Sequence, residues 1–171
     1  MLGSRSGEAI KTKEVETEVR TKTKMRTQSI VLLIILTALI VPVIYIYAYH
    51  GIHEIETSAD AKKKGNEMKY LRATGEGYFF IVTAISYAVI IGLILWKPNK
   101  QFPYYMLIFG TLAIIIIYYL RTTTGIPVLW SGVMIKEYLV DWNDVISKIG
   151  QYALIIPATI LLMQARYKTK I

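Results

Sequence analysis

The sequence predicts an all-α integral membrane protein in which four transmembrane helices form an antiparallel bundle. Two observations carry this prediction. The chain of 171 residues is 54% hydrophobic and contains long runs without any charged residue, which is typical of a small multi-pass membrane protein. The basic residues flank these runs, as they do when charge sets the orientation of membrane helices. One membrane domain accounts for the apolar part of the chain.

Composition also excludes several classes of function. The chain has no cysteine, so disulfides, thiolate metal sites, iron–sulfur clusters and thiol redox chemistry are absent. Its formal net charge of +8 resembles that of a nucleic-acid-binding protein, but the Lys and Arg residues lie beside apolar runs. We therefore expect the lipid bilayer and other membrane subunits as partners, and no nucleic acid.

Residues 1–28 are predicted to be a polar cytoplasmic tail, because they mix Lys, Arg, Glu and Thr and contain little to bury. The first transmembrane helix follows at 29–49, uncharged and long enough for a hydrocarbon layer of about 30 Å. The long polar lead-in and the full-length apolar run predict that no signal peptide is cleaved. Pro42 predicts a kink, because it removes one backbone hydrogen bond.

Residues 51–77 are predicted to connect the first two transmembrane helices, because acids and bases occur there in equal numbers. The connection is too long for a turn and could form a short amphipathic helix on the membrane surface, interrupted at Gly65 and Asn66. Thr74 and Glu76 are predicted to start the next helix, with Thr74 as its cap and Glu76 as an acid in its first turn.

The remaining transmembrane helices are predicted at 78–96, 104–120 and 144–165, which gives a transmembrane domain over 29–166. A basic turn with two prolines joins the second and third helices, so these must be antiparallel neighbours. Asp141 or Asn143 is expected to cap the fourth helix, and the chain closes on a basic end at 167–171.

The distribution of acids predicts the orientation. The turn between the second and third helices and the C-terminal end contain Lys and Arg but no acid, and the N-terminal tail is net basic. By the positive-inside rule, both termini are expected to be cytoplasmic, with the 51–77 and 121–143 connections on the outer side. The expected location is the cell membrane, crossed four times.

Arg121 and four later polar residues are predicted to form a structural polar network. Arg121 ends the third helix at a Thr-Gly-Pro turn, and Asp141, Asp144, Lys148 and Gln151 recur at steps of three and four on one face of the fourth helix. An ion pair from Arg121 to Asp144 or Asp141 would join the two helices. The alternative is a proton or solute path through Asp144, Lys148 and Gln151. The structural interpretation is favoured because no acid lies at mid-membrane depth.

The two histidines are the candidate metal ligands. His50 and His53 are one helical turn apart with Glu54 beside them, so they could present nitrogen and oxygen ligands to copper or zinc. No third strong ligand is evident, and solvated interfacial side chains are the simpler interpretation. Haem is disfavoured, because two histidines on one helical turn cannot bind opposite sides of an iron. We expect no cofactor in this chain, with copper or zinc as the alternative.

No catalytic constellation is visible in the sequence. Glu76 between two glycines could be a general base, but a helix-start carboxylate is the ordinary explanation. There is no glycine-rich phosphate loop, nucleophile elbow or pair of catalytic carboxylates. The chain is therefore not expected to have catalytic residues of its own.

Two stretches resemble known proteins: the turn Arg-Thr-Thr-Thr-Gly-Ile-Pro at 121–127 and the stripe from Asp144 through Lys148 to Gln151. Together they resemble a group of small four-helix membrane proteins, with an Arg-Thr-Thr-Gly-Leu/Ile-Pro turn after helix three and an Asp-to-Lys-to-Glu/Gln stripe opening helix four. This resemblance implies a fold rather than a reaction. The richness in Ile, Lys and Tyr also resembles proteins of ammonia-oxidising archaea, whose membrane ammonia monooxygenase has small helical accessory subunits.

These observations predict an accessory or structural subunit of a larger integral-membrane complex. The second resemblance suggests the archaeal ammonia monooxygenase, so the chain would belong to a membrane oxidoreductase of ammonia oxidation. It differs from the metal-bearing core subunits of that enzyme, because it has only two histidines, both near one helix end. The alternative is a small transporter or channel, suggested by the polar stripe in the fourth helix and by prolines in helices one and four.

Overall fold

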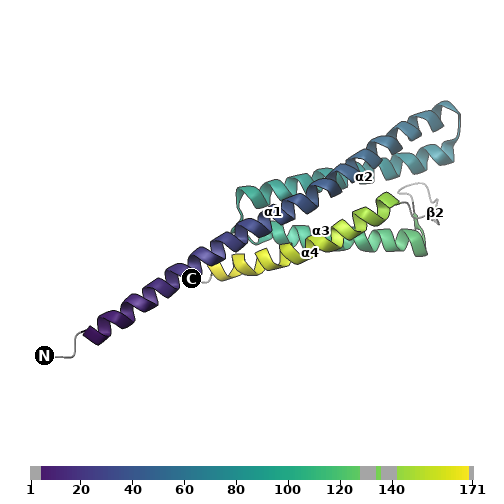
Figure 1. Cartoon of the computed structure of the whole chain (residues 1–171). Coiled ribbons are helices and arrows are strands. Elements are labelled where there is room, and N and C mark those ends of the chain that lie inside the picture. The colour runs from purple at the N-terminus through teal and green to yellow at the C-terminus, as the bar shows by residue number, and fades with distance from the viewer. Residues whose placement is uncertain (1–4, 128–133, 136–141, 170–171) are drawn as a thin grey trace.

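The computed structural model describes the backbone of residues 5–127, 134–135 and 142–169, and the side chains of 27–125 and 145–167. Two two-residue strands lie between the third and fourth helices and pair in an antiparallel manner, with Ile126 opposite Ile135. The elements, in chain order, are α1 (Arg5–Lys63), α2 (Glu67–Trp96), α3 (Phe102–Thr123), β1 (Ile126–Pro127), β2 (Met134–Ile135) and α4 (Trp142–Thr169) (Figure 1).

Four helices in the described part of the chain are long and apolar enough to cross a membrane. Each of the four predicted transmembrane segments overlaps one of them, so the prediction of an all-α structure with four helices able to span a membrane is confirmed. The candidate spans lie within Thr27–Lys63, Glu67–Trp96, Phe102–Thr123 and Val145–Tyr167.

Helix α1 is much longer than its predicted transmembrane segment. Its 59 residues pass through both predicted boundaries, at 28/29 and at 49, and Pro42 lies inside the helix without ending it. Beyond the apolar run the helix continues through Ala, Lys and Glu, which are good helix formers, and Lys62 and Lys63 lie in its last turn, where cations are favoured. In Figure 1 its N-terminal part extends beyond the other helices.

The predicted connection over 51–77 is wrong, because only residues 64–66 separate α1 from α2. The interruption does fall at the predicted dipeptide: Gly65 has a φ of 67°, which favours glycine, and the Asn66 side chain accepts a hydrogen bond of 3.0 Å from the Lys69 amide. Thr74 and Glu76 therefore do not start a helix. They lie inside α2, where the Thr74 hydroxyl donates to the Tyr70 carbonyl at 2.7 Å.

Two glycines allow α1 and α2 to pack closely. A Cβ on Gly77 would lie 2.9 Å from Ile55 Cγ1 and 3.2 Å from the Gly51 carbonyl oxygen, and a Cβ on Gly51 would lie 2.7 Å from Ile81 Cγ1. Such contacts are typical of close helix packing in membranes. The contact continues toward the turn at 64–66, where the Ser58 and Thr74 hydroxyls are 2.5 Å apart. This tight pairing explains why both helices continue beyond their apolar runs.

The apolar core receives side chains from all four helices. In α3 the buried residues all lie between Pro103 and Thr111, so within the described residues its second half has no buried side chain. That half includes the all-isoleucine run 114–117, of which Ile114 is partly buried against the core. The fully buried apolar residues of the core include Leu36, Ile40, Ile94, Tyr104, Leu107, Leu154 and Ala158.

Candidate functional site

Five buried or half-buried polar side chains from four helices meet inside the bundle. They are Tyr47 of α1, Tyr87 of α2, Thr111 of α3, and Lys148 and Gln151 of α4, and we call them the polar core. Thr111 and Gln151 are 0% exposed, Tyr87 is 2% exposed and Tyr47 is 4% exposed. All five lie within helices that are apolar enough to cross a membrane, where polar groups need partners inside the protein.

The polar core is connected by hydrogen bonds. The Gln151 amide nitrogen donates to the Tyr47 hydroxyl oxygen at 2.7 Å. The Lys148 ammonium donates to the same oxygen at 3.0 Å and to Gln151 Oε1 at 3.2 Å. The Tyr87 hydroxyl donates to Thr111 Oγ1 at 3.1 Å, and its oxygen lies 3.5 Å from Gln151 Nε2. A chain of polar groups therefore links all four helices.

Two aromatic rings face the charge of Lys148. Its ammonium nitrogen lies 4.3 Å from the centroid of the Tyr118 ring and 5.6 Å from that of Tyr47, so cation–π attraction adds to its hydrogen bonds. A charge inside a membrane span is costly unless it is paired or hydrated. Gly150 brings α4 close to α1 here, since a Cβ on it would lie 3.0 Å from Val43 Cγ2.

A second cluster consists of four charged side chains. Arg121 Nη2 lies 3.1 Å from Glu76 Oε2, and Arg72 Nε lies 2.9 Å from Glu76 Oε1. The side chains of Arg121 and Glu76 are only 14% and 11% exposed, whereas Arg72 is 42% exposed. Glu54 of α1 is within electrostatic range of all three. We call Glu54, Arg72, Glu76 and Arg121 the charge cluster. Its ion pair from Glu76 to Arg121 joins α2 to α3, and Glu54 of α1 lies nearby.

The structure divides the predicted network between these two clusters. Arg121 pairs with Glu76, an acid 45 positions earlier in the chain, and Glu76 is an ion-pair partner rather than a helix-start carboxylate. Lys148 and Gln151 are bonded to each other in the polar core. The side chains of Asp141 and Asp144 lie outside the described residues, so the pairing of either with Arg121 stays a prediction.

The two histidines among the predicted metal ligands lie around one tyrosine. The Tyr49 ring stacks on His53, with centroids 6.5 Å apart and planes 4° apart, and it meets His50 edge-on at 5.9 Å. Within the described residues, no group of three or more His, Asp or Glu side chains is placed to hold a metal ion. Copper or zinc binding by His50, His53 and Glu54 would therefore need a ligand from elsewhere.

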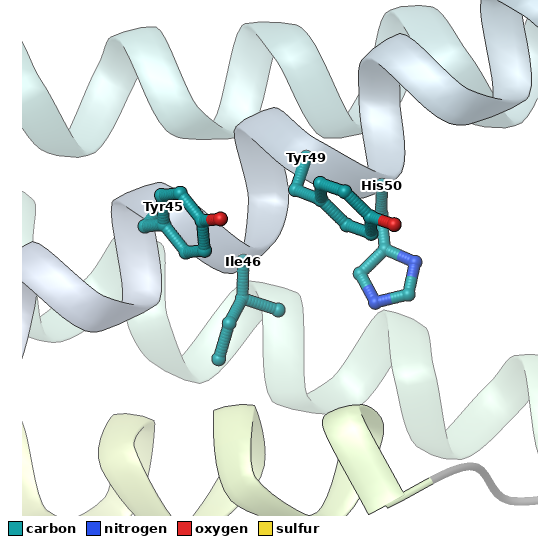
Figure 2. Close-up of a pocket in the computed structure, with 4 residues that line it drawn as sticks. All are labelled: Tyr45, Ile46, Tyr49 and His50. Atoms are coloured by element: carbon teal, nitrogen blue, oxygen red, sulfur yellow. The ribbon is translucent and has the colours of Figure 1, made fainter.

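His50 also lines a pocket on α1, together with Tyr45, Ile46 and Tyr49 (Figure 2). The pocket has a volume of about 130 Å³. The His50 ring lies 5.9 Å from the ring of Phe80 in α2. Its Nε2 atom is buried and has no hydrogen-bond partner among the described residues. A buried unpaired polar atom costs about 1–3 kcal/mol.

Sequence reasoning missed three members of the polar core. Tyr47, Tyr87 and Thr111 are not among the predicted site residues. A signal was available, because a tyrosine hydroxyl inside an apolar run needs a hydrogen-bond partner when it is buried. Lys148 and Gln151, spaced three residues apart on an apolar helix, need partners of the same kind.

Neither cluster contains a nucleophile next to a general base, and both consist of groups that bond to one another across helices. Such an arrangement suits the joining of helices. Comparison of the chain with protein-family models gives no match, and comparisons with curated proteins and with solved structures give none either. What the chain does has to be inferred from its own residues.

Proposed function

We propose that this chain is a non-catalytic accessory or structural subunit of a larger integral-membrane complex in the cell membrane. The observation that carries the proposal is the mutual bonding of the polar groups inside the spans. Gln151 and Lys148 share Tyr47 as a partner, and Glu76 holds both Arg72 and Arg121. Polar side chains used in this way hold helices together and leave no described group arranged as a catalyst.

We further propose that the four helices form an antiparallel bundle with both termini in the cytoplasm. Contacts between α1 and α2 support this, since Gly51 meets Ile81 while Ser58 meets Thr74. The acid-free basic turn between α2 and α3 supports the orientation.

The native chain has no cysteine, so single cysteines can report the two sides of the membrane. A membrane-impermeant thiol reagent should label Lys63→Cys in intact cells, and Lys100→Cys only after the cells are permeabilised. Labelling of both positions in intact cells, or of neither, would contradict the proposed topology.

Other subunits have ample apolar surface to contact. Only 17–39% of each candidate span is buried within this chain, and the second half of α3 has no buried side chain among the described residues. Lipid can cover such surface, and so can the helices of a partner. The archaeal ammonia monooxygenase is the complex that we propose to test first, on the resemblance in composition.

Native electrophoresis of source membranes in a mild detergent tests the proposal. We expect the chain to comigrate with larger subunits, identified by mass spectrometry of the excised band. A harsher detergent should release the chain as a small species and so serve as the control. Migration as a lone small monomer in the mild detergent would overturn the proposal.

A small transporter or channel is the second candidate, favoured by the position of the polar core. Its groups continue from Lys148, near the start of α4, to Thr111 in the middle of α3. Polar side chains within spans often mark solute or ion paths, and a proline inside a helix removes one backbone hydrogen bond without ending the helix here. Pro42 and Pro157 lie inside the two terminal helices.

Flux measurements in proteoliposomes distinguish this candidate from a structural subunit. Lys148→Ala and Gln151→Leu should abolish a flux that passes through the polar core. Ser86→Ala is the control, because this exposed hydroxyl donates only within its own helix, to the Val82 carbonyl at 2.7 Å. Flux that is the same in all variants and in the unaltered chain would rule out a path through the polar core.

A further inference from the structure

We propose that one end of the helix bundle binds the anionic lipid headgroups of one leaflet of the membrane. The cations concerned lie before the apolar run of α1, in the turn between α2 and α3, and at the end of α4. We call these nine residues the basic collar: Arg20, Lys22, Lys24, Arg26, Lys97, Lys100, Arg166, Lys168 and Lys170. The proposal requires only that the helices cross a bilayer, and it is independent of the accessory role.

The basic collar contains the net charge of the chain. No Asp or Glu occurs in the stretches 19–53, 77–136 and 145–171, which include all nine cations. Of the 20 Lys and Arg residues, the other 11 are offset by the 12 acids of the chain. The net charge of +8 therefore belongs to this end, and it attracts a partner with many negative charges.

Contacts between helices bring the three parts of the basic collar to the same end of the bundle. The Ser29 hydroxyl donates to Gln164 Oε1 at 2.7 Å, which joins the start of the apolar run of α1 to the end of α4. Arg166 of α4 donates to the hydroxyl of Tyr105, five residues after Lys100 in the basic turn. Figure 1 shows the last turns of α4 beside α1.

Aromatic rings hold two cations of the basic collar at the level of the headgroups. The Lys97 ammonium lies 4.1 Å from the centroid of the Trp96 ring, and the Arg166 guanidinium lies 5.4 Å from that of Tyr105. The rings of Trp96 and Tyr167 are among the most exposed in the structure, at 72% and 74%. Exposed Trp and Tyr at helix ends are typical of the membrane interface, so the adjacent cations lie at the depth of lipid phosphates.

The continuous helix α1 separates the basic residues from the acids of the N-terminal segment. At about 1.5 Å per residue, Lys24 and Arg26 lie within about 8 Å of Ser29 along the helix, about one Debye length at physiological salt. Glu18, the nearest acid before them, lies about 17 Å from Ser29, where salt screens its charge from the headgroups. Attraction to an anionic leaflet is therefore little reduced by these acids.

Quenching of Trp96 by brominated lipids measures which lipid lies beside the basic collar. Trp130→Phe/Trp142→Phe leaves Trp96 as the single tryptophan of the full chain, which is reconstituted in mixtures of phosphatidylglycerol and phosphatidylcholine. We expect phosphatidylglycerol to bind about fivefold more strongly, the effect of one Lys or Arg near an anionic surface. This preference should be present at about 0.1 M salt and lost at about 1 M. Orientation during insertion uses the same charges, but it is complete before this measurement.

Charge removal at each end of the bundle provides the matched comparison. Lys97→Gln, Lys100→Gln and Arg166→Gln, combined in one variant, should reduce the preference for phosphatidylglycerol toward one. The control variant combines Lys62→Gln, Lys63→Gln and Lys64→Gln, which removes the same charge from exposed lysines at the other end of α1. We expect this control to keep the full preference. If the collar variant does not fold, the salt dependence of the chain with an intact collar tests the same attraction.

Four outcomes would overturn the proposal. Equal binding of the two lipids at about 0.1 M salt would show that the collar does not select anionic headgroups, and a preference unchanged at about 1 M salt would show that charge does not cause it. Equal losses in the collar and control variants would mean that only the total charge matters. Binding of soluble polyglutamate without any lipid preference would assign the collar to an acidic soluble protein instead.

Discussion

The charge cluster and the polar core join helices in different ways. The charge cluster holds Glu76 between Arg72 and Arg121, beside the part of α2 that precedes its apolar run, and its outermost member is 42% exposed. The polar core contains one charge, that of Lys148, and its neutral members are at most 4% exposed. Ion pairs thus join the helices in the charge cluster, whereas hydroxyl and amide groups around the single charge of Lys148 connect them in the polar core.

Among the changes that test this difference, removal of one member of the shielded ion pair should cause the largest loss of stability. We expect Arg121→Ala or Glu76→Ala to cost about 3 kcal/mol, because each leaves a charge that has little access to water. Arg72→Ala should cost less than about 1 kcal/mol, since this side chain is more exposed. Thermal unfolding in detergent measures all three.

The double variant Arg121→Ala/Glu76→Ala tests whether the pair is coupled. It should lose less stability than the sum of the two single variants. Simple additivity of two small losses would show that Arg121 is only an interfacial charge.

Gly77→Ala should separate α1 from α2 next to the charge cluster. The added Cβ would lie 3.2 Å from the backbone oxygen of Gly51, so the helices must move apart, at a cost of about 1–3 kcal/mol. Gly92→Ala is the control within the same helix, because its Cβ would meet nothing within 4 Å. Equal melting temperatures for the two variants would contradict the close approach at Gly77.

Gln151→Leu should weaken the polar core by about 1–2 kcal/mol, because it keeps the size of the side chain but removes two hydrogen-bonding groups. Gln164→Leu provides a comparison at the other end of α4, where the amide oxygen accepts one hydrogen bond of 2.7 Å from Ser29. We expect a smaller change in melting temperature there. A larger change for Gln164→Leu would show that the polar core is not the main connection between α4 and the other helices.

Tyr87→Phe should have the smallest effect, about 0.6 kcal/mol, which is the average worth of a side-chain hydrogen bond between membrane helices. It removes the donor to Thr111 and keeps the ring. A double-mutant cycle with Thr111→Val isolates the interaction. Zero coupling would mean that the deepest bond of the polar core adds nothing to stability.

The membrane spans were predictable because they depend on local composition. Long apolar runs appear in the sequence wherever the structure has a helix able to span a membrane. The true length of α1 was not predictable from hydropathy, since its continuation to Lys63 contains charged residues. That continuation depends on packing against α2 through Gly51 and Gly77, which are far apart in the sequence.

The candidate site was predicted only in part, for the same reason. Spacing along one helix placed Lys148 and Gln151 together, and the structure shows them bonded. Spacing could not identify Glu76 as the partner of Arg121, because the two lie on different helices and the nearer acids in the sequence follow Arg121. Contacts between helices depend on tertiary packing, which a single sequence does not display.

The continuity of α1 has a mechanical consequence. At about 1.5 Å per residue, a helix of this length measures roughly 90 Å, about three times the thickness of the hydrocarbon layer. It is therefore a lever, and a tilt of about 5° around its midpoint would displace each end by roughly 4 Å. Pro42, where one backbone hydrogen bond is lost, is the natural point for such a lever to bend. A movement at one end of α1 is in this way transmitted to its other end, beyond the apolar run.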